Sequence, residues 1–462
     1  MIPLQISEIA TAVGGTIVGI EPHTITSAKA VIDSRKAQSG TFFAALPGSR
    51  VDGNDFARSA IDAGAEFVLT NLNLGLPSIV VDDVARALSK LAGYARTRMN
   101  TCTFIAITGS QGKTTTKDLA GQVLSHAGET VVPEGSLNND LGVPLTILSC
   151  TESTKFCVIE MGARHIGDIA ALVKVAQPTI GVVLVVGSAH VGEFGSREAI
   201  AQAKSEIVAE LPAGASAILG TYDPYTPAMK TPAGVKRILF GAGVEADVRA
   251  ADIEIRSAAA HFDLVTPRGR APVSLKILGE HHIPNALAAA AIALEVGMGV
   301  EQIAVALSEA EISSKWRMEL HEIGGRILLN DSYNANPESM AAALRSLVLL
   351  AQESGGASWA FLGKMHELGE LEGQSHLDIG RLACELGVDH LVAIGTDLYF
   401  NGLGLDSSDA HAMSVHYVLT QEQALSMAWH SEEGDALLVK ASRAEHLDEL
   451  AEKLLAQWHE EA

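Results

Sequence analysis

Basic segments, long apolar runs and cysteines are all scarce in this chain of 462 residues. Lys and Arg total 33 against 55 Asp and Glu, and no basic run offers the surface that a phosphate backbone requires, so we expect no nucleic-acid partner. No apolar run reaches the roughly 18 residues of a membrane-spanning helix. Residues 1–12 lack a basic head followed by an apolar stretch, which predicts that no secretory signal is present.

The four cysteines, Cys102, Cys150, Cys157 and Cys384, show no metal-ligand spacing. They are typical of reduced, mostly buried thiols, so we expect a cytoplasmic protein, and we expect it to be a monomer. Hydrophobic residues make up 47% of the chain and aromatic residues only 5%, a composition that suits helices packed closely on sheets. One ordinary domain spans about 100–200 residues, so the length predicts several domains.

The first two of three predicted domains cover residues 1–100 and 101–314. The first combines short apolar runs with helical stretches. The second begins with a continuous apolar run at 104–108, typical of a strand buried on both faces of a parallel sheet. Strands and helices then alternate, which predicts a doubly wound α/β sheet. Short alternating segments at 246–277 predict an antiparallel appendage to that sheet.

The third predicted domain covers residues 315–462. Four predicted strands, at 327–330, 359–362, 390–394 and 436–440, each precede a helical stretch. This pattern favours a second, smaller α/β domain of Rossmann-like type. The fold class expected from the sequence is therefore α/β throughout, in three domains.

A glycine-rich loop after the 104–108 strand is the strongest local signal in the sequence. Its glycines let backbone N–H groups approach phosphate oxygens, and the helix that follows adds its N-terminus to this anion site. Lys113 is expected to reach the β- and γ-phosphates of ATP, and the Thr114 hydroxyl is expected to bind Mg²⁺. Ile107 stands where the general phosphate-loop motif has glycine. The predicted nucleotide-binding residues are Gly109, Ser110, Gln111, Gly112, Lys113, Thr114 and Thr115.

Two polar residues follow predicted strands near this loop. Glu160 ends the strand at 156–160, and a carboxylate there would face the phosphates and hold a metal ion. An isolated glutamate at a strand end is normally solvated, but the neighbouring phosphate loop favours the metal site. His190 follows the strand predicted at 180–186, at the sheet edge where ligands bind in such folds. A structural role and a ligand-binding role both remain open for His190.

Two further segments carry little signal by themselves. Lys204 lies in a predicted helix, where a lysine is normally a solvated surface charge. Asn138 and Asn139 begin a polar turn before a helix start, and spacing alone favours a simple turn.

Taken in order along nearly the whole chain, these motifs resemble the Mur ligases, the ATP-dependent amide-forming enzymes of peptidoglycan precursor synthesis. The resemblance rests on the phosphate loop at 106–115, Glu160-Met161-Gly162, His190, Lys204 and the segment Gly279 to Asn285. His282 replaces an asparagine of the family pattern, and Trp316 replaces the glycine that usually precedes Arg317.

The resemblance implies roles for several of these residues. It places Thr114 and Glu160 on one Mg²⁺, and it places His190 and Lys204 on a second. In several members of the family the lysine that matches Lys204 is carbamylated, and only that anionic form is able to ligate a metal ion. Nucleotide contacts are implied for Asn285, Arg317 and Asp331. The catalytic set is Lys113, Glu160, His190, Lys204 and Arg317.

Within the family, the third segment is most similar to the branch that adds D-alanyl-D-alanine to UDP-N-acetylmuramoyl-tripeptide. Residues 331–337, 362–369 and 439–443 carry that similarity, with Lys364 and Ala441 as departures from the branch pattern. The first segment resembles a UDP-sugar-binding domain at 33–35 and 40–44. The resemblance implies substrate contacts from Ser34, Arg35, Asn138, Asn139, Tyr333, Asn334, Asn336, Ser442 and Arg443.

The function implied is formation of an amide bond through an acyl phosphate, with ATP and Mg²⁺ as cofactors and with domain closure over the substrates. One alternative is a relative that adds lysine or a diamino acid to the dipeptide precursor, which residues 331–337 disfavour. Folylpolyglutamate synthase is a more distant alternative, which Ser34 and Arg35 disfavour. A phosphate-loop protein that uses ATP as a conformational switch remains open as a different class.

Overall fold

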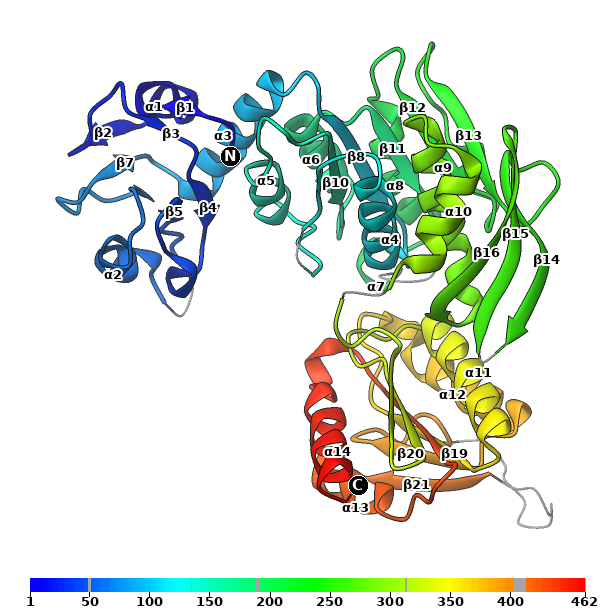
Figure 1. The fold of residues 1–462 in the computed structure, drawn as a ribbon. Helices are drawn as coiled ribbons and strands as arrows, with labels where there is room; N and C mark the ends of the chain where they lie inside the picture. The colour runs from blue at the N-terminus through cyan, green and yellow to red at the C-terminus, as the bar shows by residue number, and fades with distance from the viewer. Residues whose placement is uncertain are drawn as a thin grey trace.

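Three large β-sheets, one in each domain, organise the chain into three α/β domains (Figure 1). The computed structural model describes residues 1–48, 51–133, 135–187, 191–256, 258–311, 314–401 and 413–461. The three-domain α/β fold expected from the sequence is confirmed, whereas the domain limits after residues 100 and 314 stay predictions. None of the helices in these ranges combines the length and apolarity that a bilayer span requires.

The N-terminal domain is built on a five-stranded sheet in the order β2-β7-β6-β5-β4, in which only the β2–β7 pair is antiparallel. A two-stranded pair, β1 and β3, lies beside α1. The elements are β1 (Leu4–Gln5), α1 (Ile6–Val13), β2 (Thr16–Val18), β3 (Ile25–Thr26), β4 (Lys29–Val31), β5 (Thr41–Ala44), α2 (Ala57–Asp62), β6 (Val68–Thr70) and β7 (Ser78–Val80).

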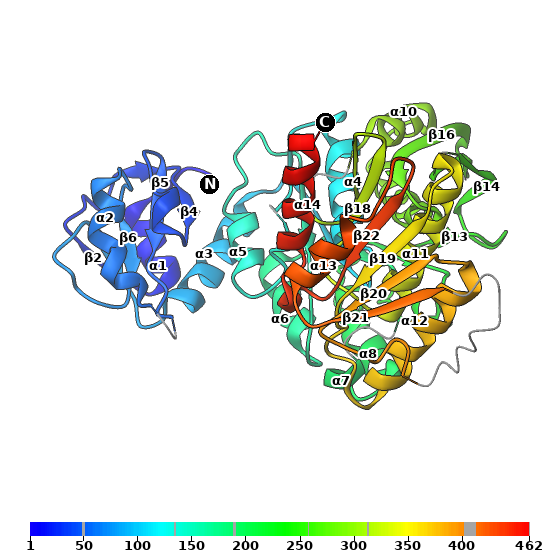
Figure 2. The same ribbon diagram turned by 90° about the horizontal axis from the view of Figure 1, so that it is seen from below.

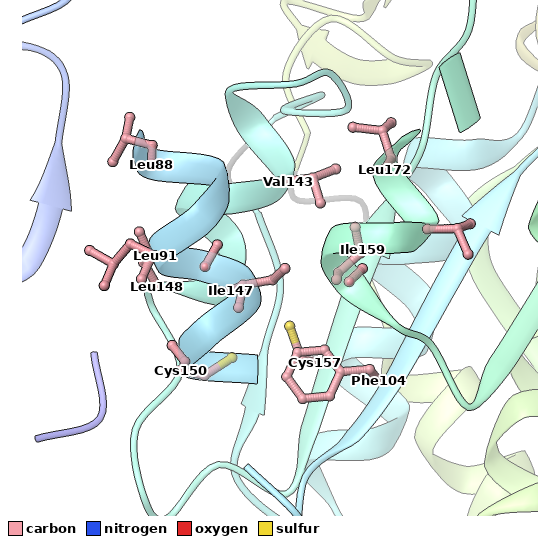
Figure 3. Packing of buried hydrophobic residues seen from close by; sticks show 14 of the residues in the cluster. Leu88, Leu91, Phe104, Val143, Ile147, Leu148, Cys150, Cys157, Ile159 and Leu172 are labelled. Atoms are coloured by element: carbon pink, nitrogen blue, oxygen red, sulfur yellow. The ribbon is translucent and has the colours of Figure 1, made fainter. Parts of the chain in front are cut away.

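Helix α3 (Val84–Arg98) joins the N-terminal domain to the central one. Asp83 caps its first turn by accepting a hydrogen bond from the Arg86 backbone N–H, as expected for an N-cap aspartate. Its apolar face, with Leu88 and Leu91, packs in one core with central-domain residues such as Ile147 (Figure 3). The helix therefore packs with residues of both domains in a single core and fixes where the N-terminal domain attaches.

The central domain contains a nine-stranded sheet in the order β16-β15-β14-β13-β12-β11-β8-β10-β9. The pairs from β9 to β14 are all parallel, and the β14–β15 and β15–β16 pairs are antiparallel. The strands are β8 (Thr103–Thr108), β9 (Thr130–Val131), β10 (Phe156–Glu160), β11 (Ile180–Val183), β12 (Ser216–Gly220), β13 (Lys236–Gly241), β14 (Val248–Arg256), β15 (Ala259–Thr266) and β16 (Gly269–Leu278).

Strand β8 is buried on both faces, as its apolar run predicts. Phe104 and Ala106 face one core together with α5 (Gly142–Ile147), α6 (Asp168–Ala176) and α8 (Arg197–Ala209). Ile105 and Ile107 face the other core, which holds α4 (Lys113–Ser125), α9 (Ile283–Glu295) and α10 (Val300–Glu309). A short helix, α7 (Val191–Phe194), precedes α8. Because β8 lies between β10 and β11, its carboxyl end is the switch point of the sheet, where ligands bind in such folds.

The antiparallel appendage is present, but the expectation of short strands is wrong. Strands β14, β15 and β16 contain 9, 8 and 10 residues. Polar residues alternate with buried ones along β15 and β16, because one face of this extension packs on the core that contains α10 while the other meets solvent.

The C-terminal domain has a six-stranded sheet in the order β17-β18-β22-β19-β20-β21, and only the β17–β18 pair is antiparallel. Two cores cover its faces, one with α11 and α12 and the other with α13 and α14. The elements are β17 (Glu319–Ile323), β18 (Arg326–Asn330), α11 (Pro337–Ser354), β19 (Ser358–Leu362), α12 (Glu372–Leu386), β20 (His390–Ile394), β21 (Ser414–Val418), α13 (Gln421–Ala428), β22 (Ala436–Lys440) and α14 (Asp448–Glu461).

One strand of the third domain does not lead into the predicted helix. Within the described residues β20 is followed by another strand, β21, rather than by a helix. The half-exposed β21 lies at the sheet edge and does not produce the continuous apolar run of a central strand. Seen from below, the C-terminal domain overlies the central domain, whereas the N-terminal domain stands to one side (Figure 2).

Candidate active site

The phosphate loop runs from the buried end of β8 into α4, as the sequence predicts. Gly112 has φ +79, and a Cβ atom there would lie 2.3 Å from Asn285 Oδ1, so both the conformation and the space require glycine. The segment after β11 holds the loop in place, because the Ser110 backbone N–H donates to Val185 O at 2.9 Å. The Ser110 hydroxyl in turn accepts from the Gly187 backbone N–H at 2.9 Å. The anion-binding turn is therefore preformed.

A cavity of about 1010 Å³ opens over this loop and is lined by the central and C-terminal domains. On the central side it contains predicted residues from the phosphate loop and its surroundings: Ser110, Gln111, Gly112, Lys113, Thr114, Thr115, Asn138, Asn139, Glu160, Lys204 and Asn285. On the other side it contains predicted residues of the linker and the third domain: Arg317, Asp331, Tyr333, Asn334 and Asn336. Residues far apart in sequence thus meet around one space.

Lys113 is half-buried at the first position of α4. Its Nζ atom donates a hydrogen bond back to Gly109 O at 2.8 Å. Burial lowers the pKa of Lys113; the Glu160 carboxylate opposes this effect and the Arg317 guanidinium adds to it. Among the described residues no carboxylate forms an ion pair with Lys113, so this cation is positioned to meet an anion that the chain itself does not supply.

Oxygen ligands cluster beside the phosphate loop. The Thr114 hydroxyl donates to Glu160 Oε2 at 2.8 Å, and Ser136 Oγ lies 3.0 Å from Thr114 Oγ1. The other carboxylate oxygen, Oε1, accepts from Asn138 Nδ2 at 2.7 Å. One carboxylate with neighbouring hydroxyls suits Mg²⁺, which keeps several waters and is commonly bound by one or two carboxylates together with substrate phosphates. The residues present therefore fit a magnesium ion at Thr114 and Glu160.

Lys204 points into the same cavity from α8 and is only 4% exposed. Burial holds its pKa well below the usual range, and the charge of Lys113 lowers it further. No carboxylate of the described residues forms an ion pair with it. Glu206, two residues later, is occupied elsewhere: it accepts from the Gly167 and Ala170 backbone N–H groups at the start of α6, at 2.6 and 2.9 Å. Lys204 is therefore not the solvated surface lysine that its position in a helix would ordinarily suggest.

Arg317 crosses from the interdomain linker to the phosphate-loop side. Its Nη2 donates to Ser136 Oγ at 3.2 Å, and its guanidinium lies 4.0 Å from the centre of the Tyr333 ring. Its Nε is buried, and no described residue accepts a hydrogen bond from it. The residues on either side, Trp316 and Met318, have φ +60 and +52, a strained conformation for non-glycine residues. The backbone is therefore bent sharply to present Arg317.

Asp331 is held by a lysine that sequence reasoning did not select. Lys440 is 1% exposed, and its Nζ lies 2.5 Å from Asp331 Oδ2 and donates to Asn334 O at 2.8 Å. Asp331 Oδ1 accepts from the Met318 backbone N–H at 3.2 Å. The start of the loop with Tyr333 and Asn334 is thereby fixed to β22 and to the linker.

Other residues of the cavity wall were also missed. Ser136 is one, and no motif distinguishes it from other loop serines. The rings of His281 and His282 lie in contact in a tilted arrangement, with their centres 4.1 Å apart, and the pKa of both is lowered by burial, for His281 to about 4. His282 Nδ1 lies 3.1 Å from Asn285 Nδ2, which ties this departure from the family pattern to a predicted nucleotide contact.

Five predicted site residues are not part of the cavity wall: Gly109, Ser34, Arg35, Ser442 and Arg443. Gly109 supports Lys113 from behind, and Arg35 is exposed and paired with Asp33 at 2.7 Å. Ser442 accepts from the His366 backbone N–H at 2.9 Å, and Arg443 stacks on Trp316 with 4.3 Å to the ring centre. His190 lies outside the described residues, so its expected metal role stays a prediction.

The family models match three parts of the chain, and the matches together cover most of it. They are the Mur ligase middle domain at residues 107–293, the Mur ligase glutamate ligase domain at 316–443, and the Mur ligase family catalytic domain at 30–96.

Relatives and solved structures agree with these matches. The UDP-N-acetylmuramoyl-tripeptide–D-alanyl-D-alanine ligase of Mycobacterium tuberculosis is 40% identical, covering 99% of this chain and 98% of that protein. The enzyme of the same name from Escherichia coli is 32% identical over 98% and 99%. A crystal structure of MurF from Acinetobacter baumannii superposes with a TM-score of 0.86 at 33% identity over 98% and 99%. MurF ligase from Thermotoga maritima, solved with ADP, gives 0.78 at 26% over 94% and 99%. The chain belongs to the Mur ligase family.

Proposed function

We propose that this chain is an ATP-dependent ligase that joins D-alanyl-D-alanine to UDP-N-acetylmuramoyl-tripeptide in peptidoglycan synthesis. The observation that carries the proposal is the cavity itself, where a phosphate loop on one domain faces Arg317, Tyr333 and Asn334 on another. The names of the full-length relatives support the choice of substrates. A switch ATPase needs no second wall of this kind.

The chemistry follows from the weakness of a carboxylate as an electrophile. The terminal carboxylate of the tripeptide attacks the γ-phosphorus of ATP, and ADP leaves, which gives an acyl phosphate. The neutral amine of D-alanyl-D-alanine then attacks the acyl carbon, phosphate departs and the nitrogen loses a proton. Both reactants of the first step are anions, so the positive charges of Lys113 and Arg317 reduce the repulsion between them.

A magnesium ion would be held by Thr114 and Glu160 and would neutralise phosphate charge at this site. Asn138 supports that role, because its side chain orients the Glu160 carboxylate from the far side. A second metal position, at His190 and Lys204, is part of the proposal. Asn285 and Asp331 are assigned to the nucleotide, and Asn139, Tyr333, Asn334, Asn336, Ser442 and Arg443 to the peptide substrates.

Lys204 takes part as a carbamate in this proposal. The neutral amine adds CO₂ and releases a proton, which converts an uncharged amine into a metal-ligating anion. Burial and the nearby Lys113 favour the neutral amine, the form that reacts with CO₂. The same buried position excludes an ordinary solvated role for this side chain.

The N-terminal domain is proposed to bind the UDP-sugar through the half-buried Ser34 and the exposed Arg35. We further propose a monomer that works in the cytoplasm. All four cysteines are free thiols, which suits a reducing compartment.

An acceptor panel tests the proposed function. Enzyme, ATP and Mg²⁺ are mixed with UDP-N-acetylmuramoyl-tripeptide, and phosphate release is measured with and without D-alanyl-D-alanine. We expect release to begin only with that dipeptide. A response to lysine or diaminopimelate with the UDP-muramoyl dipeptide would instead identify the related ligase, and release that ignores every acceptor would identify a switch ATPase.

A further inference from the structure

Two charged residues of α4 are fully buried and have no part in the proposed chemistry. Lys117 is 1% and Asp118 4% exposed, and Lys117 Nζ lies 2.6 Å from Asp118 Oδ1. Consecutive residues of a helix point in different directions, so the two side chains reach each other only by bending together in the core. Apolar residues of similar volume would fill this space at lower cost, because burying two charges requires many compensating contacts. The contacts of this pair therefore indicate what it does.

Lys117 holds the loop that carries Ser136 and Asn138, which contact the magnesium site proposed at Thr114 and Glu160. Its Nζ donates to Pro133 O at 2.9 Å and to Gly135 O at 3.1 Å. The residues immediately following are Ser136, which lies 3.0 Å from Thr114 Oγ1, and Asn138, which donates to Glu160 at 2.7 Å. A single buried ammonium thus sets the position of the segment that supplies both side chains.

Asp118 holds the linker that leads to the C-terminal domain. Its Oδ2 accepts from the Ser314 hydroxyl at 2.5 Å. One turn further along α4, Gln122 forms two hydrogen bonds with the backbone of Glu311, at 2.6 and 3.0 Å. The same linker continues directly to Arg317, which reaches Ser136 at 3.2 Å. Helix α4 lies at the end of the central domain that faces the C-terminal domain (Figure 1).

We propose that Lys117 and Asp118 are positioning residues that fix two separate segments relative to the phosphate loop. Lys117 fixes Pro133 and Gly135, next to the magnesium site proposed at Thr114 and Glu160, and Asp118 fixes the linker at Ser314, which leads to Arg317. Both side chains come from the helix that follows the phosphate loop, so a single helix positions both segments relative to that loop. The inference rests on the proposed function for ATP as the nucleotide, but not for the identity of the acceptor.

Two variants separate the two roles. The double variant K117M/D118N leaves no buried charge, removes the hydrogen bonds to Pro133 and Gly135, and keeps an oxygen acceptor for Ser314. S314A removes only the contact between the linker and Asp118. The matched control is D435N. Asp435, like Asp118, is a buried carboxylate, and it accepts three hydrogen bonds. It lies just before β22, whereas Lys440 ends that strand, so it is remote from the contacts of Lys117 and Asp118.

The measurements are Mg²⁺-dependent ADP binding by calorimetry, steady-state kcat and KM, and the melting temperature of the full chain. K117M/D118N is expected to raise the Mg²⁺ concentration at half-saturation about tenfold or more, the effect of losing hydrogen bonds from a charged donor. S314A is expected to leave Mg²⁺ saturation unchanged and to lower kcat by about threefold to tenfold, the loss of one hydrogen bond. D435N is expected to lower the melting temperature alone.

The proposal is overturned if K117M/D118N and S314A, like D435N, melt earlier but keep wild-type Mg²⁺ saturation and kcat below their melting temperatures. It is also overturned if S314A changes Mg²⁺ saturation and not kcat, since the linker contact would then have no role of its own. S314A removes a single hydroxyl and retains the ion pair, so the linker arm is testable even when the double variant does not fold. Failure of the proposed function is detected by a different measurement: wild-type enzyme would then release no phosphate in response to D-alanyl-D-alanine. Mg²⁺-dependent ADP binding would still show whether Lys117 positions the magnesium site.

Discussion

The lysines on the two walls of the cavity differ in whether a carboxylate pairs with them. On the C-terminal side, Lys440 has an ion pair with Asp331 at 2.5 Å and a carbonyl partner in Asn334. On the central side, Lys113 and Lys204 have no ion pair with any described carboxylate, and burial lowers the pKa of both. A buried lysine paired with a carboxylate stabilises the fold. A lysine without such a partner has a desolvation penalty that only a bound ligand or a chemical modification offsets.

One of the two largest expected effects is the loss of turnover in Lys113→Ala. If this lysine neutralises the γ-phosphate, kcat falls by at least about a hundredfold while the melting temperature stays near that of the wild type. The fold is expected to survive because Lys113 forms no ion pair with a described carboxylate, so its removal leaves no carboxylate unpaired. Near-normal turnover in a folded variant would contradict the phosphate-loop assignment.

Lys204→Ala is expected to abolish turnover almost completely, because it removes the proposed metal-ligating anion. Formate or acetate should restore part of the activity by placing a carboxylate in the vacated space, and Lys204→Glu should retain a little. Lys174→Ala, on the exposed face of α6, is the control and should change neither activity nor stability by more than about 0.5 kcal/mol. Wild-type activity in Lys204→Ala would rule out the carbamate, and mass analysis of the intact enzyme checks for it directly.

Stability separates the two walls in a second way. Lys440→Met leaves the Asp331 carboxylate without its partner and should lower the free energy of unfolding by about 3–5 kcal/mol. Lys204→Met removes a buried polar side chain that has no carboxylate partner and should leave stability unchanged or raised. Urea denaturation measures both. Equal losses in the two variants would show that pairing does not distinguish these lysines.

A smaller effect is expected from buried histidines on pH dependence. Burial lowers the pKa of His281 to about 4, from about 6.5. The unfolded chain then binds the proton more tightly, so the contribution of His281 is complete above pH 6.5 and is lost as the pH falls to about 4. His281→Gln should flatten the decline in unfolding free energy across that window. An unchanged slope would show that His281 does not titrate differently in the folded state.

The sequence predicts the central domain well, and particular residues show why. Strand β8 is a continuous apolar run followed by Gly109, and the phosphate loop then leads into α4, as the motif predicts. Both signals are local. The strands that were missed, such as β13, β17 and β21, include half-exposed edges whose short, mixed runs resemble loops.

The cavity could be predicted only in part. The phosphate loop and the strand-end position of Glu160 are local signals, and the family resemblance adds Asn285, which the fold places beside them. The burial of Lys204 depends on how α8 packs, and its spacing in the helix gives no sign of it. The pairing of Lys440 with Asp331 joins residues 109 positions apart, so no local pattern reports it.

The central claim, transfer of the γ-phosphoryl group to a carboxylate, is tested most directly by isotope transfer. UDP-N-acetylmuramoyl-tripeptide labelled with ¹⁸O in its terminal carboxylate is turned over with ATP, Mg²⁺ and D-alanyl-D-alanine, and the released phosphate is analysed by mass spectrometry. Because the acyl phosphate breaks between carbon and oxygen, one carboxylate oxygen leaves with phosphorus, and each phosphate should carry one ¹⁸O atom. Unlabelled phosphate would mean that water attacks ATP and would contradict the ligase mechanism.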